Sequence, residues 1–501
     1  MRGARVATAR LARRLPALLV AAALLAAPAR AAADGTPTLP TNDLQDLVSL
    51  VGLGTPVPVP TQLNPEPVLA PVPAAKCNAK SHPLAGEQGR VPASAIESPA
   101  AANGWTCNTS VVGHFPASGG FRVWRYVDPS GHTCAFYDTS LFSPANVVRL
   151  ALGPSSGVAV LDMSNPASPV QTATLTDAAM LAPHESLNLN TRRGLLAAEM
   201  GNGTTLPGLM SIYDVKQDCR HPVLDALYVA APFGHESGFS PDGNTFWVAG
   251  GEGIAAVDVT DPTKPQTIWE ADEFAHGLNV SDDGNTLYDS DPIDGHLTII
   301  NVREVQARQP SPMVNEVSRL TWNTVSVPQN TDPMTIEGKP YLLEFDEFGF
   351  RFDPPTIEDK VGGARIISIS DPTHPRVVSN LRLSVNMKAS HEAADGDPSP
   401  MPSSAFTYSS HYCAIPREVN PEIVACSFIN SGLRIFNIDN PLHPREVAYY
   451  ISPPAANPPA EAADFAMSQP AFDPARRQIW YTDATSGFYV VQLGATQWPH
   501  P

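Results

Sequence analysis

A strand followed by a fixed proline turn recurs along the chain and constrains the fold more than any other feature. Each copy alternates apolar and small residues, ends at Asp-Pro or Asn-Pro, and has a second proline three residues after the first. The alternation is the period of a β-strand, and proline ends a strand because it has no N–H to donate. Regular copies are residues 157–169, 253–265, 364–375 and 433–444, and variants are residues 209–222, 296–310 and 487–493.

The half of each unit that precedes this element also repeats. It consists of a histidine, a short strand, a polar turn such as SPDG (240–243) or SDDG (281–284), and a second strand. Such turns between apolar runs are typical of hairpins. The second proline of the turn element would open a fourth strand at the outer edge of each unit. Units begin near residues 132, 184, 235, 276, 324, 411 and 467.

Seven such units predict an all-β chain with the architecture of a seven-bladed β-propeller and four-stranded antiparallel blades. A four-stranded sheet cannot bury both faces alone, so units of roughly 40–50 residues must stack on their neighbours. A solenoid is the alternative, although it would need capping units. The last unit lacks a fourth strand, and residues 110–127 contain a strand pattern that could supply it and close the ring. We therefore place the propeller at residues 110–493, followed by a tail at 494–501.

The first 109 residues of the chain have a different character. Residues 1–33 combine arginines, an apolar run and small A-x-A sites, which predicts a secretory signal peptide of the general export type rather than the twin-arginine type. Residues 34–109 are punctuated by proline and are expected to form a largely disordered arm. The apolar run is too short for a membrane span. A formal charge of −18 argues against nucleic acid as a partner. We expect the protein to be secreted and monomeric.

Six cysteines are predicted to form disulfides, because an even count in an exported protein is typical of an oxidised framework. Cys413 and Cys426 flank a turn between two strands and are expected to face each other across that hairpin. The partners of Cys77, Cys107, Cys134 and Cys219 stay open at this point.

The strand followed by D-P-x-x-P resembles the LVIVD repeat of secreted bacterial β-propeller proteins, over residues 130 to 493. The resemblance implies a propeller and export, and it implies no particular activity. A more distant likeness links the chain to selenium-binding, methanethiol-oxidising propellers, which use histidines near the central channel for a metal. Only the pattern of a histidine before a strand is shared with them.

Four histidines hold the same place in their units, directly before the innermost strand: His184, His235, His276 and His411, with His132 as a fifth candidate. Imidazoles that converge on one axis can bind copper, zinc or iron. Glu185, Glu236 and the pair His391-Glu392 could support such a site. The alternative is structural: Gly234-His235 could bond Asp242 and lock the blade, as Gly-His pairs do in other propellers.

Two functions follow from these interpretations. The first is a binding scaffold with a protein or small-molecule ligand at the channel mouth, because no strong catalytic motif is present. The alternative is a metal-dependent oxidase or hydrolase with His184, His235, His276 and His411 at the channel mouth. The two are separated by whether the four imidazoles point to one place.

Overall fold

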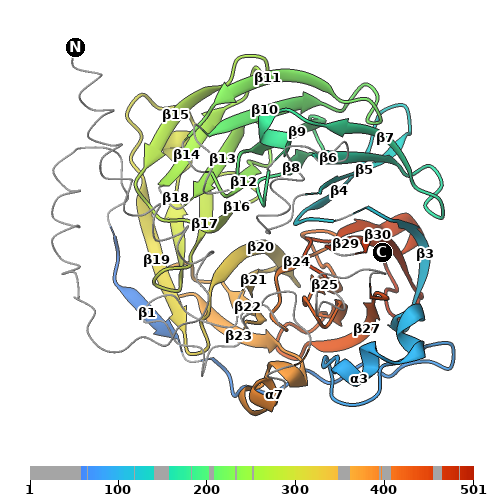
Figure 1. Ribbon diagram of the computed structural model, residues 1–501. Helices are drawn as coiled ribbons and strands as arrows, with labels where there is room; N and C mark the ends of the chain where they lie inside the picture. Colours follow the sequence, from blue (N-terminus) through green and yellow to red (C-terminus); the bar gives the residue numbers. More distant parts are fainter. Residues whose placement is uncertain are drawn as a thin grey trace, which may run out of the picture.

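The computed structural model describes the chain from residue 58 to its end, with several gaps. The gaps are residues 65, 118, 140–156, 182, 202–207, 232–233, 251–252, 348–361, 394–396, 398–407, 455–464 and 485. The predicted signal peptide therefore lies outside the described residues. Within them, the strands form seven sheets arranged around a central axis, and this confirms the predicted propeller (Figure 1).

The first four blades follow the chain from residue 123 to residue 322, each built from four consecutive antiparallel strands. Blade 1 consists of β4 (Val123–Val127), β5 (Thr133–Asp138), β6 (Val158–Asp162) and β7 (Val170–Leu175). Blade 2 consists of β8 (Asn188–Asn190), β9 (Leu195–Glu199), β10 (Leu209–Asp214) and β11 (Val223–Val229). Blade 3 consists of β12 (Glu236–Phe239), β13 (Thr245–Gly250), β14 (Gly253–Asp258) and β15 (Gln266–Ala271). Blade 4 consists of β16 (Gly277–Val280), β17 (Thr286–Asp291), β18 (His296–Asn301) and β19 (Asn315–Trp322).

The last three blades continue the ring and close it. Blade 5 consists of β20 (Pro328–Ile336), β21 (Lys339–Asp346), β22 (Ala364–Ser368) and β23 (Arg376–Leu381). Blade 6 consists of β24 (Tyr412–Ala414), β25 (Ile423–Ser427), β26 (Leu433–Asn437) and β27 (Arg445–Ile451). Blade 7 consists of β28 (Ala471–Asp473), β29 (Gln478–Asp483) and β30 (Gly487–Leu493), and its outer strand is β3 (Thr109–Phe115) from the N-terminal side. The antiparallel pairing of β3 with β30 is the predicted closure.

One unit starts earlier than predicted. The innermost strand of blade 1 is β4, so the unit opens near residue 123 and not near residue 132. His132 lies in the turn between β4 and β5, where its Nδ1 is 2.8 Å from an Asp128 carboxylate oxygen. The predicted start was wrong because GHTCAF (131–136) resembles SHYCAI (410–415), which does open a blade.

The proline turns form as their chemistry requires. In blade 3, the Thr263 N–H donates to Asp261 Oδ1 at 3.1 Å and the Lys264 N–H donates to the Asp261 carbonyl at 3.0 Å. The Asp side chain thereby caps the turn, and Pro265 directly precedes the fourth strand, β15. The same pair of bonds recurs at Asp371 and Asn440.

The hydrophobic core lies between blades. Trp247, Ile254 and Trp269 of blade 3 pack against Leu287 and Ile300 of blade 4, and comparable clusters join other neighbouring blades. This arrangement leaves the polar side chains of the inner strands to fill the axis.

The N-terminal arm differs from its expected disorder in the part that the structure describes. The strand β1 (Thr61–Asn64) pairs parallel to β19, and β2 (Trp105–Cys107) pairs antiparallel to β27, so the arm covers the outer edges of blades 4 and 6. Edge strands expose unpaired backbone groups, and these added strands satisfy them. The remaining described helices are short: α3 (Ala93–Ile96), η1 (Pro99–Asn103), α5 (Ala178–Leu181), α6 (Arg303–Gln306), η2 (Ser384–Asn386), α7 (Lys388–Ala393) and η3 (Pro474–Arg476). None of the described helices has the length and apolar character of a membrane span.

Three disulfides reinforce this framework. Cys413 and Cys426 are bonded across the β24–β25 hairpin, as predicted. Cys134–Cys219 ties blade 1 to the turn of blade 2, and Cys77–Cys107 fixes the arm. Such bonds form and persist in oxidising compartments.

Candidate metal centre

The four predicted histidines all lie where the chain enters an inner strand. His235, His276 and His411 directly precede β12, β16 and β24, and His184 lies shortly before β8. The backbone N–H groups of the first three each donate to a carbonyl of the second strand in the same blade: Ala249 at 2.6 Å, Ser290 at 2.8 Å and Ser427 at 2.9 Å. The repeated backbone bond therefore places the imidazoles of His235, His276 and His411 at equivalent positions in their blades.

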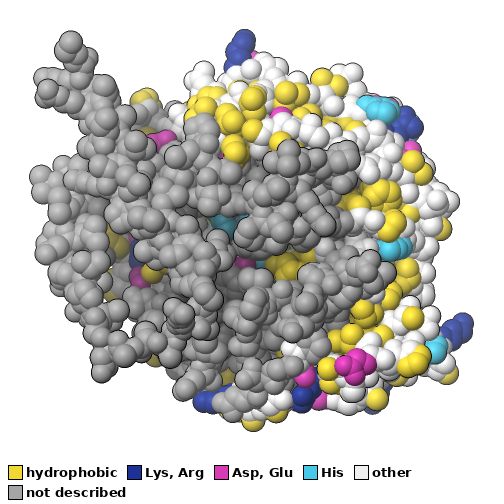
Figure 2. Space-filling model, in the orientation of Figure 1, with side chains coloured by type: hydrophobic (Ala, Val, Ile, Leu, Met, Phe, Trp, Pro, Cys, Tyr) yellow, Lys and Arg dark blue, Asp and Glu magenta, His cyan; other side chains and the backbone are white. Residues whose placement is uncertain are grey.

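The side chains converge on the carboxylate of Glu185. Its oxygens lie 3.0 Å from His235 Nε2, 3.1 Å from His411 Nε2, 3.6 Å from His184 Nδ1 and 3.8 Å from His276 Nε2. Histidine side-chain atoms are visible near the centre of the face shown in Figure 2. The four imidazoles thus all approach the Glu185 carboxylate, which is the arrangement that the metal-site interpretation of the sequence expects.

A second carboxylate, Glu347, completes the cluster. It follows β21 of blade 5, and its oxygens lie 3.3 Å from His276 Nε2 and 3.6 Å from His411 Nε2. Only 3% of its side chain is exposed. Blade 5 lacks an entry histidine, so this glutamate is the contribution of that blade to the cluster.

Hydrogen bonds on the far side of the rings orient three of the imidazoles. The Nδ1 atoms of His235, His276 and His411 lie 3.2 Å, 2.8 Å and 2.6 Å from the carbonyl oxygens of Gly201, Pro328 and Met467. A carbonyl can only accept, so each Nδ1 carries a proton, and each ring in its neutral form presents an Nε2 lone pair to the centre. This is the arrangement that proteins use to hold metal-ligating histidines.

The backbone and the aromatic contacts also hold His184 in place. Its φ of 50° lies in the left-handed region, which a non-glycine residue adopts at a cost of about 1 kcal/mol or more. The His184 ring stacks on Phe121 with centroids 4.5 Å apart and lies 4.4 Å from the His235 ring. A strained residue that packing holds in a buried cluster is a common feature of functional sites.

The cluster carries strongly perturbed protonation equilibria. Burial lowers the pKa of His184 and of His276 to about 3. Burial also lowers the pKa of His411, but the carboxylates of Glu185 and Glu347 outweigh this effect and raise it to about 9. Burial raises the pKa of Glu347 to about 7, whereas the neighbouring imidazoles hold that of Glu185 well below its usual range despite its burial. Groups with such divergent pKa values in one buried cluster are typical of functional sites.

A polar plug fills the axis beside the histidines. The Arg122 guanidinium contacts the carboxylate of Glu236 and the amide oxygen of Gln469, and it lies 4.4 Å from the centre of the Tyr412 ring. The Gln329 amide donates to Glu185 Oε2 at 2.8 Å and to the Tyr412 hydroxyl at 2.9 Å. Glu236, predicted to support the site, therefore belongs to the plug, while Glu185 lies at the centre of the cluster.

The cluster fits a transition-metal ion in ligand type and spacing. Metal–ligand bonds of about 2.0–2.2 Å place neighbouring ligand atoms about 3.0–3.5 Å apart, close to the N···O separations around Glu185. Ligand atoms of His184, Glu185 and His235 lie within 4.8 Å of one another, and so do those of Glu185, Glu347 and His411. His411 Nε2 and Glu185 Oε1 are buried 3.1 Å apart, and neither atom is assigned a hydrogen-bond partner among the described residues. A shared cation would satisfy both atoms.

His235 does not contact Asp242, the partner named in the structural alternative, and one pair of supporting residues cannot be assigned. Asp242 bonds Ser240 and Asn244 within its own turn, while His235 contacts Gly201 and Glu185. The side chains of His391 and Glu392 lie outside the described residues, and their helix, α7, lies at the outer rim beyond β23 in Figure 1.

Sequence reasoning missed Glu347, Gln329, Tyr412 and Arg122. Glu347 and Gln329 belong to the degenerate fifth unit, which offers no repeat signal. Tyr412 directly follows a predicted histidine, so the alignment of the repeats could have predicted its position next to the channel.

No family model matches the chain, and no curated protein matches its sequence. Among solved structures, it is similar to the β-propeller domain of Cps50 (Swd1) from Myceliophteria thermophila, with 12% identity and a TM-score of 0.48, over 77% of this chain and 99% of that one. It is also similar to hydrazine synthase from Kuenenia stuttgartiensis, with 14% identity and a TM-score of 0.40, over 62% of this chain and 76% of that one.

Proposed function

We propose that this protein is a metal-dependent enzyme that binds a copper, zinc or iron ion at the centre of the propeller. The observation that carries the proposal is the convergence of His184, His235, His276 and His411 on Glu185, with Glu347 next to His276 and His411. Imidazole suits all three metals, and a propeller hosts many unrelated functions through the site it carries.

The residues around such a site would have different roles. A bound ion would supply Lewis acidity or a redox couple. Glu347, with a pKa of about 7, can accept or donate a proton near neutral pH beside the ligands. The plug of Arg122, Glu236 and Gln329 closes the axis on one side. His235 has 27% of its side chain exposed, the largest fraction among the four histidines, so we place substrate access on its side.

We further propose that the protein is exported and works in an oxidising compartment. The three disulfides and the predicted signal peptide at residues 1–33 support this location. The resemblance to secreted LVIVD-repeat propellers points in the same direction.

Metal analysis of protein purified without a histidine tag tests the proposal. After equilibrium dialysis against copper, zinc or iron and removal of excess ion, we expect close to one tightly held channel ion per chain. A protein that retains none of the three metals would contradict the proposal. That result would favour the first interpretation, a binding scaffold.

A further inference from the structure

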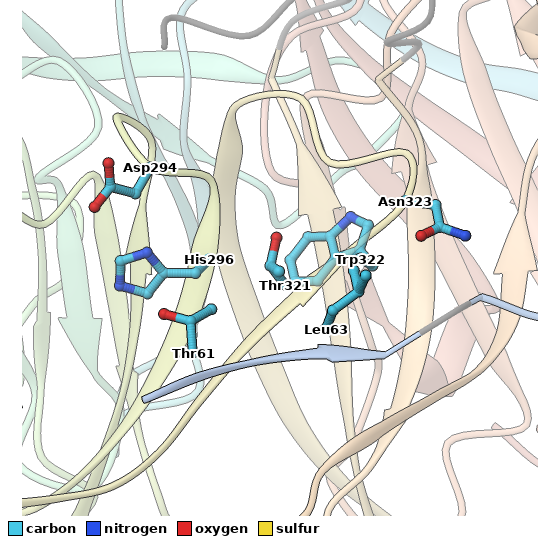
Figure 3. A pocket seen from close by; sticks show the side chains of 7 residues that line it. All are labelled: Thr61, Leu63, Asp294, His296, Thr321, Trp322 and Asn323. Carbon is cyan, nitrogen blue, oxygen red and sulfur yellow. The ribbon is translucent and has the colours of Figure 1, made fainter. Parts of the chain in front are cut away.

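A second group of metal-ligating side chains lies away from the axis, at the junction of blades 3 and 4. The loop between β17 and β18 carries Asp291, Asp294 and His296, whose candidate ligand atoms all lie within 4.8 Å of one another. Figure 3 shows Asp294 and His296 on neighbouring backbone segments with their side chains on the same side of the loop. His296 is only 1% exposed and Asp291 is 7% exposed, whereas Asp294 reaches the surface.

A fully buried carboxylate faces the same junction. Asp289 precedes Asp291 by two residues on β17, so both side chains leave the strand on the same face, and Asp289 pairs across the ladder with Thr298. Both oxygens of Asp289 are buried, and neither has a hydrogen-bond partner among the described residues. The hydroxyl of Thr298, also fully buried, has none either. Leaving a charged carboxylate buried and unpaired is costly, so Asp289 must either hold a proton or face a positive species.

The neighbouring charges do not supply that positive species. Among the described residues, the charged groups that act most strongly on Asp289 are the acids Glu273, Asp291 and Glu316 and the base Arg319. Arg319 is already paired, because its guanidinium lies 2.9 Å from Glu273 and 2.7 Å from Glu316. Among these groups, no unpaired positive charge is left for Asp289.

The junction is open on one side. A cavity of about 470 Å³ borders Asp294 and His296, and its far wall is formed by Leu63, Trp322 and Asn323 (Figure 3). Thr61 of the arm strand β1 also lines it, so the arm that covers blade 4 shapes this opening. An ion on the loop would have protein ligands on one side and room for water or a small anion on the other.

We propose that Asp291, Asp294 and His296 bind a divalent transition-metal ion of the Zn²⁺ or Mn²⁺ class, with Asp289 as the buried counter-charge behind it. One imidazole with carboxylates favours these ions over Ca²⁺, which prefers an all-oxygen set. The site is separate from the channel and does not depend on the proposed function. It is open toward the cavity, as metal sites that bind exchangeable ligands are.

Binding of Zn²⁺ or Mn²⁺ to the channel variant H235Q/H411Q, purified without a histidine tag, tests this site. We expect the variant to bind one ion per chain by equilibrium dialysis and mass spectrometry. Adding D294N should weaken that binding at least tenfold. Asp294 is exposed, so D294N should not disturb folding, and the matched control D272N removes an exposed acid next to Glu273. D272N should leave the affinity within about threefold.

The proposal is overturned if H235Q/H411Q binds neither ion, or if D294N and D272N bind equally well. The same two single variants in the wild-type background give the answer should the channel variant fold poorly: D294N should lose one ion per chain and D272N none. Failure of the channel proposal is distinguishable, because the wild type would then bind a single ion that is insensitive to H235Q/H411Q and sensitive to D294N.

Discussion

Two sets of histidines come from the same repeats and behave in opposite ways. The blade-entry histidines are drawn together around Glu185, and His411 has a fully buried side chain. The histidines of the outer proline turns, such as His374 and His443, are exposed, and His374 has 72% of its side chain in solvent beside Asp371. A repeat copies the position of a residue relative to the propeller axis. Copies near the axis must therefore meet, whereas copies at the rim must diverge.

The same comparison separates two glutamates that share one repeat position. Glu185 and Glu236 each follow a blade-entry histidine, and their backbones pair as an isolated parallel bridge. Glu185 lies among the imidazoles, whereas Glu236 pairs with Arg122 in the plug. A repeat thus fixes where the backbone is, and the local neighbours decide what the side chain does.

The largest expected effect comes from removing two ligands. H235Q/H411Q should weaken binding of copper, zinc or iron at the channel by more than about a hundredfold, because two Nε2 donors are lost. The matched rim variant H374Q/H443Q should bind like the wild type. Isothermal titration of both variants measures the difference, and equal affinities would mean that convergence on the axis has no function in metal binding.

E236Q should act on stability rather than on metal binding. It leaves the buried Arg122 without its carboxylate partner, which should lower the free energy of unfolding by about 3 kcal/mol. Urea denaturation measures this loss, and E185Q is the comparison because it should weaken metal binding instead. If E236Q lost the metal and kept its stability, the division between plug and ligand cluster would be wrong.

Metal affinity should rise with pH. His411 has a pKa of about 9, so below that pH an ion must displace its proton, and the affinity should fall about tenfold for each pH unit and each displaced proton. His184 and His276, with pKa values of about 3, are neutral throughout this range and add no such dependence. Titrations at pH 6, 7 and 8 in weakly chelating buffers measure the slope. A flat profile would show that His411 is not a ligand.

The smallest effect is expected at the rim. H374Q removes an exposed ring whose only described partners are Asp371 and Thr373, so its free energy of unfolding should change by less than about 0.5 kcal/mol. Thermal unfolding of this variant measures the change. If H374Q lowered the free energy of unfolding by several kcal/mol, the exposed outer turns would contribute more to stability than the account allows.

Much of the architecture was readable from the sequence, because proline turns and strand alternation have local causes. The D-P-x-x-P turns located the fourth strands, and the missing fourth strand of the last unit predicted the closure by β3. The blade-entry histidines followed from the same register. Glu347 could not be predicted, because its place in the cluster depends on how the degenerate fifth blade packs against blades 4 and 6. The pairing of the arm with blades 4 and 6 depends on long-range edge contacts that leave no periodic trace in residues 58–109.

Anomalous X-ray diffraction at the copper, zinc and iron absorption edges tests the central claim most directly. Crystals of untagged protein equilibrated with each metal should show a peak within bonding distance of His235 Nε2, His411 Nε2 and a Glu185 oxygen. Crystals that contain the metal in excess and show no peak inside this cluster at any of the three edges would contradict the account.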